Sequence, residues 1–93
     1  MTALHCFPLG QLLTTPAALG ALQAAGLTPL ALLARHAAGD WGDLDLKDKQ
    51  LNERALRDGG RLFSAYCLAA GSKVWIITEA DRAATTVLLP EDN

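Results

Sequence analysis

Apolar residues recur with helical spacing after each of two Thr-Pro pairs, at positions 15–16 and 28–29. In each pair the threonine hydroxyl can cap a helix, and proline suits the first helical position because its missing N–H would have no partner there. A glycine follows each stretch, at positions 26 and 39, and glycine readily adopts the left-handed conformation that ends a helix. The pattern predicts helices over 16–25 and 29–38.

A third helix is predicted between Asp45 and the glycine pair at 59–60, where charged residues and leucines alternate. Asp45 is the expected N-cap, and strong helix formers fill the stretch that follows. Leu44, Leu51 and Ala55 share one stripe, which we expect to pack against the rest of the fold. The alternating charges between them are typical of an exposed helix surface.

After Gly60 the pattern changes to that of β-strands, over 61–68, 73–78 and 85–89. Both faces of 73–78 are mostly apolar, which predicts a central strand. An apolar stretch at 4–13, interrupted by proline and glycine, is compatible with a brief edge strand or an extended arm. The sequence therefore predicts an α+β fold: three short helices, then a three-stranded antiparallel meander, with an N-terminal edge strand as an option. Pro90 ends the last strand, and 91–93 is expected to be a solvated tail.

Composition indicates one small globular domain over residues 1–93, because 51% of the 93 residues are hydrophobic and 19% are charged. The net charge is −2 and the basic residues are scattered from Arg35 to Arg82, so binding to nucleic acid is disfavoured. Cys6 and Cys67 lack any Cys-x-x-Cys spacing and are expected to be reduced, buried apolar side chains. No apolar run approaches the length of a membrane span, so we expect a cytoplasmic protein with no membrane contact.

The densest polar cluster lies between His36 and Asp43. One interpretation makes His36 a general base oriented by Asp40 or Asp43, since an imidazole near a carboxylate can titrate around neutral pH. The other has a charged His36 stabilising the end of its helix, with the aspartates competing to cap the next one. Trp41 is either a lid on the core or an exposed anchor for a partner.

A second polar segment, 78–82, joins two apolar strands and contains Glu79 and Arg82. It is either a contact for a partner or a solvated turn with an ordinary surface ion pair to Arg61. No metal-ligand spacing is present, and neither are the common nucleotide-binding or hydrolase motifs. We therefore expect no metal and no cofactor, and an enzyme is disfavoured without being excluded.

Two motifs stand out along the chain: His-x-x-Gly-Asp-Trp-Gly-Asp from His36 to Asp43, and Ile-Thr-Glu-Ala-Asp-Arg from Ile77 to Arg82. With these motifs as its signature, the chain resembles a family of small bacterial proteins carried on plasmids, phages and integrated elements, some of them labelled as a type I restriction-system subunit. The resemblance covers nearly the whole chain. The family brings no catalytic residues to this chain.

The resemblance implies a mobile-element accessory protein that binds a host or element-encoded protein, with a restriction or CRISPR defence complex as a candidate target. The expected binding residues are polar groups around a loop tryptophan: His36, Asp40, Trp41, Asp43, Glu79 and Arg82. One alternative is a small hydrolase or transferase that uses His36 with Asp40 or Asp43. Another is a structural homodimer that completes a sheet through the 85–89 edge.

Overall fold

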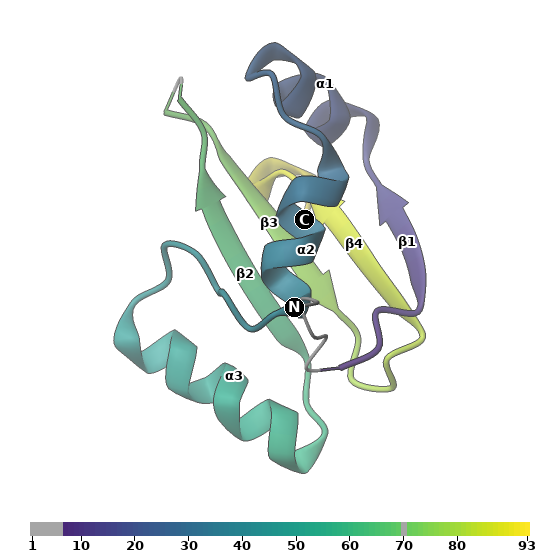
Figure 1. Cartoon of the computed structure of the whole chain (residues 1–93), viewed down its shortest axis with the longest axis vertical. Coiled ribbons are helices and arrows are strands. Elements are labelled where there is room, and N and C mark those ends of the chain that lie inside the picture. Colours follow the sequence, from purple (N-terminus) through teal and green to yellow (C-terminus); the bar gives the residue numbers. More distant parts are fainter. Residues whose placement is uncertain (1–6, 70) are drawn as a thin grey trace, which may run out of the picture.

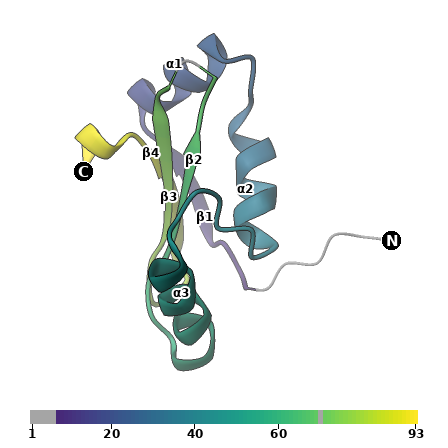
Figure 2. The same cartoon turned by 90° about the vertical axis from the view of Figure 1, so that its left-hand side faces the viewer.

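The computed structural model describes residues 7–69 and 71–93 and consists of one mixed sheet with two helices on one face and a third at its edge (Figures 1 and 2). The α+β class predicted from the sequence is confirmed. In chain order the elements are β1 Gln11–Thr14, α1 Pro16–Ala24, α2 Pro29–Ala37, α3 Leu46–Asp58, β2 Leu62–Cys67, β3 Lys73–Thr78, β4 Ala84–Leu88 and the short 3₁₀ helix η1 Pro90–Asp92.

The sheet has four strands in the order β1-β4-β3-β2. The N-terminal edge strand left as an option within 4–13 is present as β1, whereas the predicted all-antiparallel, three-stranded sheet is corrected to a mixed sheet of four strands. Strands β2, β3 and β4 do form the antiparallel meander, and β3 is central as expected. Strand β1 adds to it in parallel with β4, held at its ends by the Gln11 and Thr15 amides, which donate to the Ala83 and Val87 carbonyls at 3.0 and 2.9 Å. The 85–89 segment is therefore interior, and dimerisation through its edge is wrong.

Helices α1 and α2 begin and end where their capping residues predict. Thr15 Oγ1 accepts a hydrogen bond from the Ala18 amide at 3.1 Å, and Thr28 Oγ1 accepts one from the Ala31 amide at 3.4 Å. Each such cap contributes about 1 kcal/mol. The glycine after each helix has the positive φ expected of a helix C-terminus. These two helices can be predicted because their ends depend on local chemistry alone.

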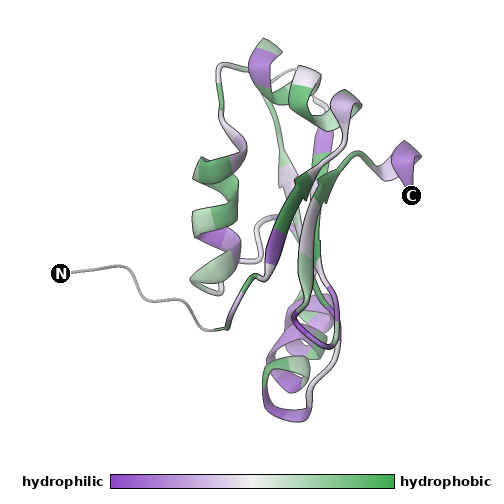
Figure 3. Ribbon diagram, turned by 90° about the vertical axis from the view of Figure 1, so that its right-hand side faces the viewer, coloured by the Kyte–Doolittle hydropathy of each residue, from purple (hydrophilic) through white to green (hydrophobic). Residues whose placement is uncertain are grey.

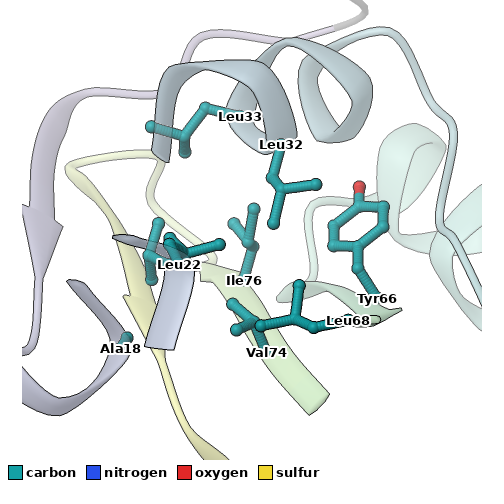
Figure 4. Packing of buried hydrophobic residues seen from close by; sticks show 9 residues of the cluster. Ala18, Leu22, Leu32, Leu33, Tyr66, Leu68, Val74 and Ile76 are labelled. Carbon is teal, nitrogen blue, oxygen red and sulfur yellow. The ribbon is translucent and has the colours of Figure 1, made fainter. Parts of the chain in front are cut away.

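The main core lies between these two helices and one face of the sheet (Figure 4). Val74 and Ile76 of β3 point toward the helices, and Leu22 and Leu32 approach them from α1 and α2. All four are buried, and full burial of each such side chain contributes about 1.5–3 kcal/mol. The complete set is Ala18, Leu22, Leu32, Leu33, Tyr66, Leu68, Val74, Ile76 and Val87.

Helix α3 begins at its predicted cap, since Asp45 Oδ1 accepts from the Asp48 amide at 2.8 Å. Of the predicted stripe, Leu44 and Ala55 pack against buried residues as expected, but Leu51 does not. Leu51 is 50% exposed and Asn52 is only 3% exposed. The Asn52 side chain donates to the Phe63 carbonyl at 2.6 Å and accepts from the Phe63 amide at 3.0 Å. Helix α3 is therefore attached to the edge of β2 by an amide side chain that replaces a neighbouring strand.

The rest of the β2 edge is covered by the loop before α3. The Ala65 amide donates to the Trp41 carbonyl at 3.2 Å, and the Ala65 carbonyl accepts from the Asp43 amide at 2.7 Å. The Asp43 carboxylate then accepts from the Cys67 amide at 2.7 Å. Residues that sequence analysis treated as candidate chemistry therefore close an edge that would otherwise be free to pair with another chain.

Two smaller expectations need correction. Cys67 is exposed rather than buried, because it lies at the end of β2 on the sheet face away from α1 and α2; Cys6 lies outside the described residues. Residues 91–93 are exposed as predicted, but Pro90–Asp92 form a turn of 3₁₀ helix instead of an irregular tail. Asp92 within it accepts from the Thr15 hydroxyl at 2.7 Å, which links this turn to the start of α1.

Hydropathy divides the molecule unevenly, with apolar residues along β1 and α2 and hydrophilic ones along α3 (Figure 3). In the described part of the chain, no single helix has the length and apolar character needed to cross a membrane. Helices α1 and α2 satisfy that test only as a pair, and they meet at a bend of 102°.

The close approach of the 41–43 loop to β2 predicts that a side chain at Gly42 would lower the stability of the protein. The φ of Gly42 is +75°, and a Cβ there would lie 2.1 Å from the Ala65 carbonyl oxygen, whereas Gly26 has φ +74° and open space around it. Gly26→Ala should therefore cost only the backbone strain, roughly 1 kcal/mol, and Gly42→Ala clearly more. Urea unfolding of both variants measures the difference. Equal losses would show that the loop does not hold the β2 edge as described.

Candidate functional site

The ring of His36 is fully buried beneath α2, with both of its nitrogens hydrogen-bonded to hydroxyl groups of the sheet. Nδ1 lies 2.5 Å from Ser64 Oγ on β2, and Nε2 lies 2.9 Å from Thr78 Oγ1 on β3. Thr78 Oγ1 lies 2.7 Å from Thr85 Oγ1 on β4, and the Thr85 hydroxyl donates to the Leu9 carbonyl at 2.7 Å. These contacts join α2, three strands and the segment that leads into β1.

The Leu9 carbonyl fixes the direction of the hydrogen bonds from Thr85 back to Nε2 of His36. A carbonyl only accepts, so the Thr85 hydroxyl donates to Leu9 and must accept from Thr78. Thr78 in turn accepts from His36 Nε2–H, so Nε2 carries a proton. In the neutral imidazole this is the Nε2–H tautomer, and Nδ1 accepts from the Ser64 hydroxyl.

Burial lowers the pKa of His36 from 6.5 to about 4, because a charged imidazolium in this site would lose its hydration. Its two polar partners are hydroxyls, and its ring packs against Phe7 and Trp41 at centroid distances of 5.2 and 5.6 Å. The expectation of a charged His36 at the helix end is wrong. His36 is a neutral hydrogen-bonding residue of the core.

Neither aspartate proposed as a partner of His36 bonds to it. Asp40 Oδ2 accepts from Arg35 Nε at 2.7 Å, and Asp40 Oδ1 accepts from the Gly42 amide. The hydrogen bond from Arg35 is the main reason that the pKa of Asp40 lies below its ordinary value. The hydrogen bond from the Cys67 amide lowers the pKa of Asp43 in the same way.

Trp41 is the lid of the core rather than an exposed anchor. It is 4% exposed, stacks on Phe7 at 6.1 Å and donates from Nε1 to Glu53 Oε2 at 2.9 Å. Together with Phe7 and Leu62 it forms a second apolar cluster, against which Ala55 and Leu56 in the second half of α3 pack. Burial of so large a ring explains why a tryptophan stands in a short polar loop.

The second polar segment also has structural contacts. Glu79 pairs with Arg61 at 3.5 Å, as the surface interpretation expected, with both side chains about half exposed. Arg82 has a φ of +61° and donates to the carbonyls of Gly60 and Ala55 at 2.6 and 3.2 Å. A positive φ is costly for a residue other than glycine, and these hydrogen bonds offset it by joining the β3–β4 turn to the end of α3.

The six residues expected to bind a partner are thus only partly gathered in space. His36, Trp41 and Arg82 surround Phe7, since the Arg82 guanidinium lies 5.8 Å from the Phe7 ring. Asp40 and Asp43 lie on the surface of the loop, and Glu79 lies on the turn beyond β3. Phe7 was missed because a lone aromatic residue in an irregular segment carries no periodic signal.

An apolar hollow of about 200 Å³ lies between β1 and α2, and sequence analysis did not anticipate it. Its lining is aliphatic throughout: Leu9, Leu12, Leu30, Leu33 and Ala34. Leu12 is 45% exposed and Leu30 is 67% exposed. We call this feature the β1–α2 hollow. With no polar or titratable side chain in its lining, it can accept an apolar group and can supply no acid, base or nucleophile.

Among residues 7–69 and 71–93 no group of three or more His, Cys, Asp or Glu side chains is placed to hold a metal ion. Comparisons of the chain with family models, with curated proteins and with solved structures each return no match.

The buried imidazole makes stability depend on pH in a defined window. The pKa of His36 is 6.5 unfolded and about 4 folded, so the unfolded chain binds more protons between these values and stability falls as the pH drops. The full shift corresponds to a loss of roughly 3 kcal/mol by pH 4. His36→Gln, which cannot titrate, should be less stable at pH 7 but flatter from pH 6.5 to 4.

Chemical unfolding at a series of pH values measures this effect for both proteins. The aspartates with lowered pKa lose their contribution mainly below their ordinary value of 3.8, so their window is separate. A wild-type protein as flat as His36→Gln between pH 6.5 and 4 would contradict the neutral, buried state of His36.

Proposed function

We propose that this protein is a non-enzymatic binding protein that acts by occupying a surface of another protein. The observation that carries the proposal is the β1–α2 hollow, whose lining is entirely aliphatic. Such a concavity suits an apolar side chain presented by a partner, since burial of that side chain would supply the binding free energy. A protein is the class of partner that presents apolar side chains in this way.

The surroundings of the hollow support a neutral protein partner. No Lys, Arg, Asp or Glu precedes Arg35, so β1, α1 and the first half of α2 carry no charged side chain. Within residues 7–69 and 71–93, seven large hydrophobic residues are exposed, and five of them belong to this part of the chain: Leu12, Leu13, Leu19, Leu27 and Leu30. A surface without charge neither attracts phosphate groups nor repels an apolar partner.

The enzyme alternative has less support. Its proposed base, His36, is fully buried and bonded to two hydroxyls, and neither Asp40 nor Asp43 contacts it. A general base must reach the proton that it removes from a substrate, and this imidazole has no exposed surface. We therefore favour binding over a hydrolase or transferase reaction.

We extend the proposal to a protein encoded on a mobile element, with a restriction or CRISPR defence complex as its target. This extension depends on the resemblance to the small plasmid and phage proteins. Among the residues of the resembling motifs, Asp40, Asp43, Glu79 and Arg82 have exposed or partly exposed side chains. These four residues remain candidates for a second, polar contact area. The mechanism of such a contact would be steric: the bound protein covers part of the surface of the target complex.

The test compares two leucines that are about equally exposed on different elements. Leu30 in the hollow is 67% exposed and Leu46 on α3 is 71% exposed. Tagged wild type, Leu30→Lys and Leu46→Lys are used for capture from host lysate, and the affinity for the retained complex is then measured by calorimetry. We expect Leu30→Lys to weaken binding at least tenfold, or by about 1.4 kcal/mol, and Leu46→Lys to bind as wild type does.

The polar candidates are tested in parallel with Asp40→Asn, which keeps the shape of the side chain and removes its charge. Circular dichroism checks that each variant is folded. If the folded Leu30→Lys and Leu46→Lys variants retain the complex equally well, the hollow is not the binding site. If wild type retains nothing, the binding proposal itself fails.

A further inference from the structure

The two edges of the sheet differ in how their backbone groups are satisfied. Along β2 the outward amides and carbonyls are bonded by the Asn52 side chain, the 41–43 loop and the Asp43 carboxylate. Along β1 no hydrogen bond of the described residues reaches the outward groups. Edge strands are commonly protected by a charged side chain, a proline or a bulge. The four residues of β1 contain none of these.

The pairing of β1 with β4 determines which backbone groups are free. The Gln11 and Thr15 amides donate toward β4, and successive residues of a strand direct their N–H and C=O groups to alternate sides. The outward groups therefore belong to Leu12 and Thr14. Each offers one donor and one acceptor, so this edge can receive an antiparallel strand that carries the same spacing of groups.

The spacing of the outward N–H and C=O groups on β1 is complementary to that of a second, antiparallel copy of β1. If two copies of β1 pair antiparallel about a two-fold axis that passes beside Leu13, Leu12 of each copy lies opposite Thr14 of the other. The two outward pairs then exchange four hydrogen bonds across the axis. Leu13, which is 43% exposed on the sheet face away from α2, meets its own counterpart at the axis.

Charge also favours a second copy as the occupant of this edge. The whole stretch from Phe7 to Ala34 carries no Lys, Arg, Asp or Glu, so two such surfaces meet without like-charge repulsion. A strand with charged side chains would find no counter-charge there. We propose that the protein forms a two-fold symmetric dimer in which β1 pairs antiparallel with β1 of a second copy, giving a continuous eight-stranded sheet.

The dimer would place both β1–α2 hollows on one side of that sheet. A two-fold axis perpendicular to a sheet preserves its faces, so the α2 helices of both copies lie over the same face. A partner of the kind proposed above would then meet two hollows instead of one. The dimer itself does not require such a partner, so self-association and binding of a host protein are measured separately.

The test introduces charged side chains at position 13, which lies beside the proposed two-fold axis. Purified wild type should sediment at twice its 9.8 kDa chain mass at high concentration. Leu13→Lys and Leu13→Glu should each sediment as monomers, because like charges would face each other across a pair about 4.5 Å apart at Cα. An equimolar mixture of the two variants should recover the dimer, because opposite charges then meet. Leu46→Lys, on α3, should remain dimeric.

The amides of Leu12 and Thr14 give a second, residue-specific measurement that needs no substitution. Their hydrogen exchange should slow as the protein concentration rises, whereas amides on exposed turns should not change. A wild type that stays monomeric at about millimolar concentration would overturn the proposal. So would Leu13→Lys and Leu13→Glu variants that both remain dimeric, since the interface would then lie elsewhere.

Discussion

A chain of hydrogen bonds through the buried ring of His36 joins nearly every layer of this protein. It runs from the Ser64 hydroxyl through His36, Thr78 and Thr85 to the Leu9 carbonyl. The chain satisfies five polar groups that would otherwise be costly to bury. It also sets the position of α2 over β2 and β3, and of the segment that begins β1. The β1–α2 hollow has its shape because these elements are held in register.

The same loop that follows His36 completes one side of the sheet. Trp41 closes the second core cluster, Gly42 allows the backbone to approach Ala65, and Asp43 bonds the end of β2. Each residue of the signature therefore has a structural contact that accounts for its type. A conspicuous polar sequence can in this way reflect the requirements of an edge as much as those of a binding site.

Charged side chains are confined to one half of the sequence, and this division determines which contacts each half of the molecule can make. All eighteen charged side chains lie from Arg35 onward, that is, from the last turn of α2 through α3 and the later strands and turns. The other half presents leucines, an apolar hollow and an unprotected strand edge. Contacts that bury apolar area and satisfy free amides are the contacts that this half can make, and both proposals follow from that.

By itself the sequence determined the local features: the helix starts at Thr15 and Thr28, their glycine ends, the cap at Asp45 and the antiparallel meander. These depend on residues close together in the chain, so composition and spacing suffice to predict them. The tertiary structure alone decided the parallel pairing of β1, the burial of His36 and Trp41, and the hydrogen bonds of Asn52. Each of these joins residues distant in the chain, and a residue's type does not reveal which distant group it will meet. His36 shows the consequence, since the same imidazole would be a charged surface group beside Asp40 and is a neutral core group between two hydroxyls.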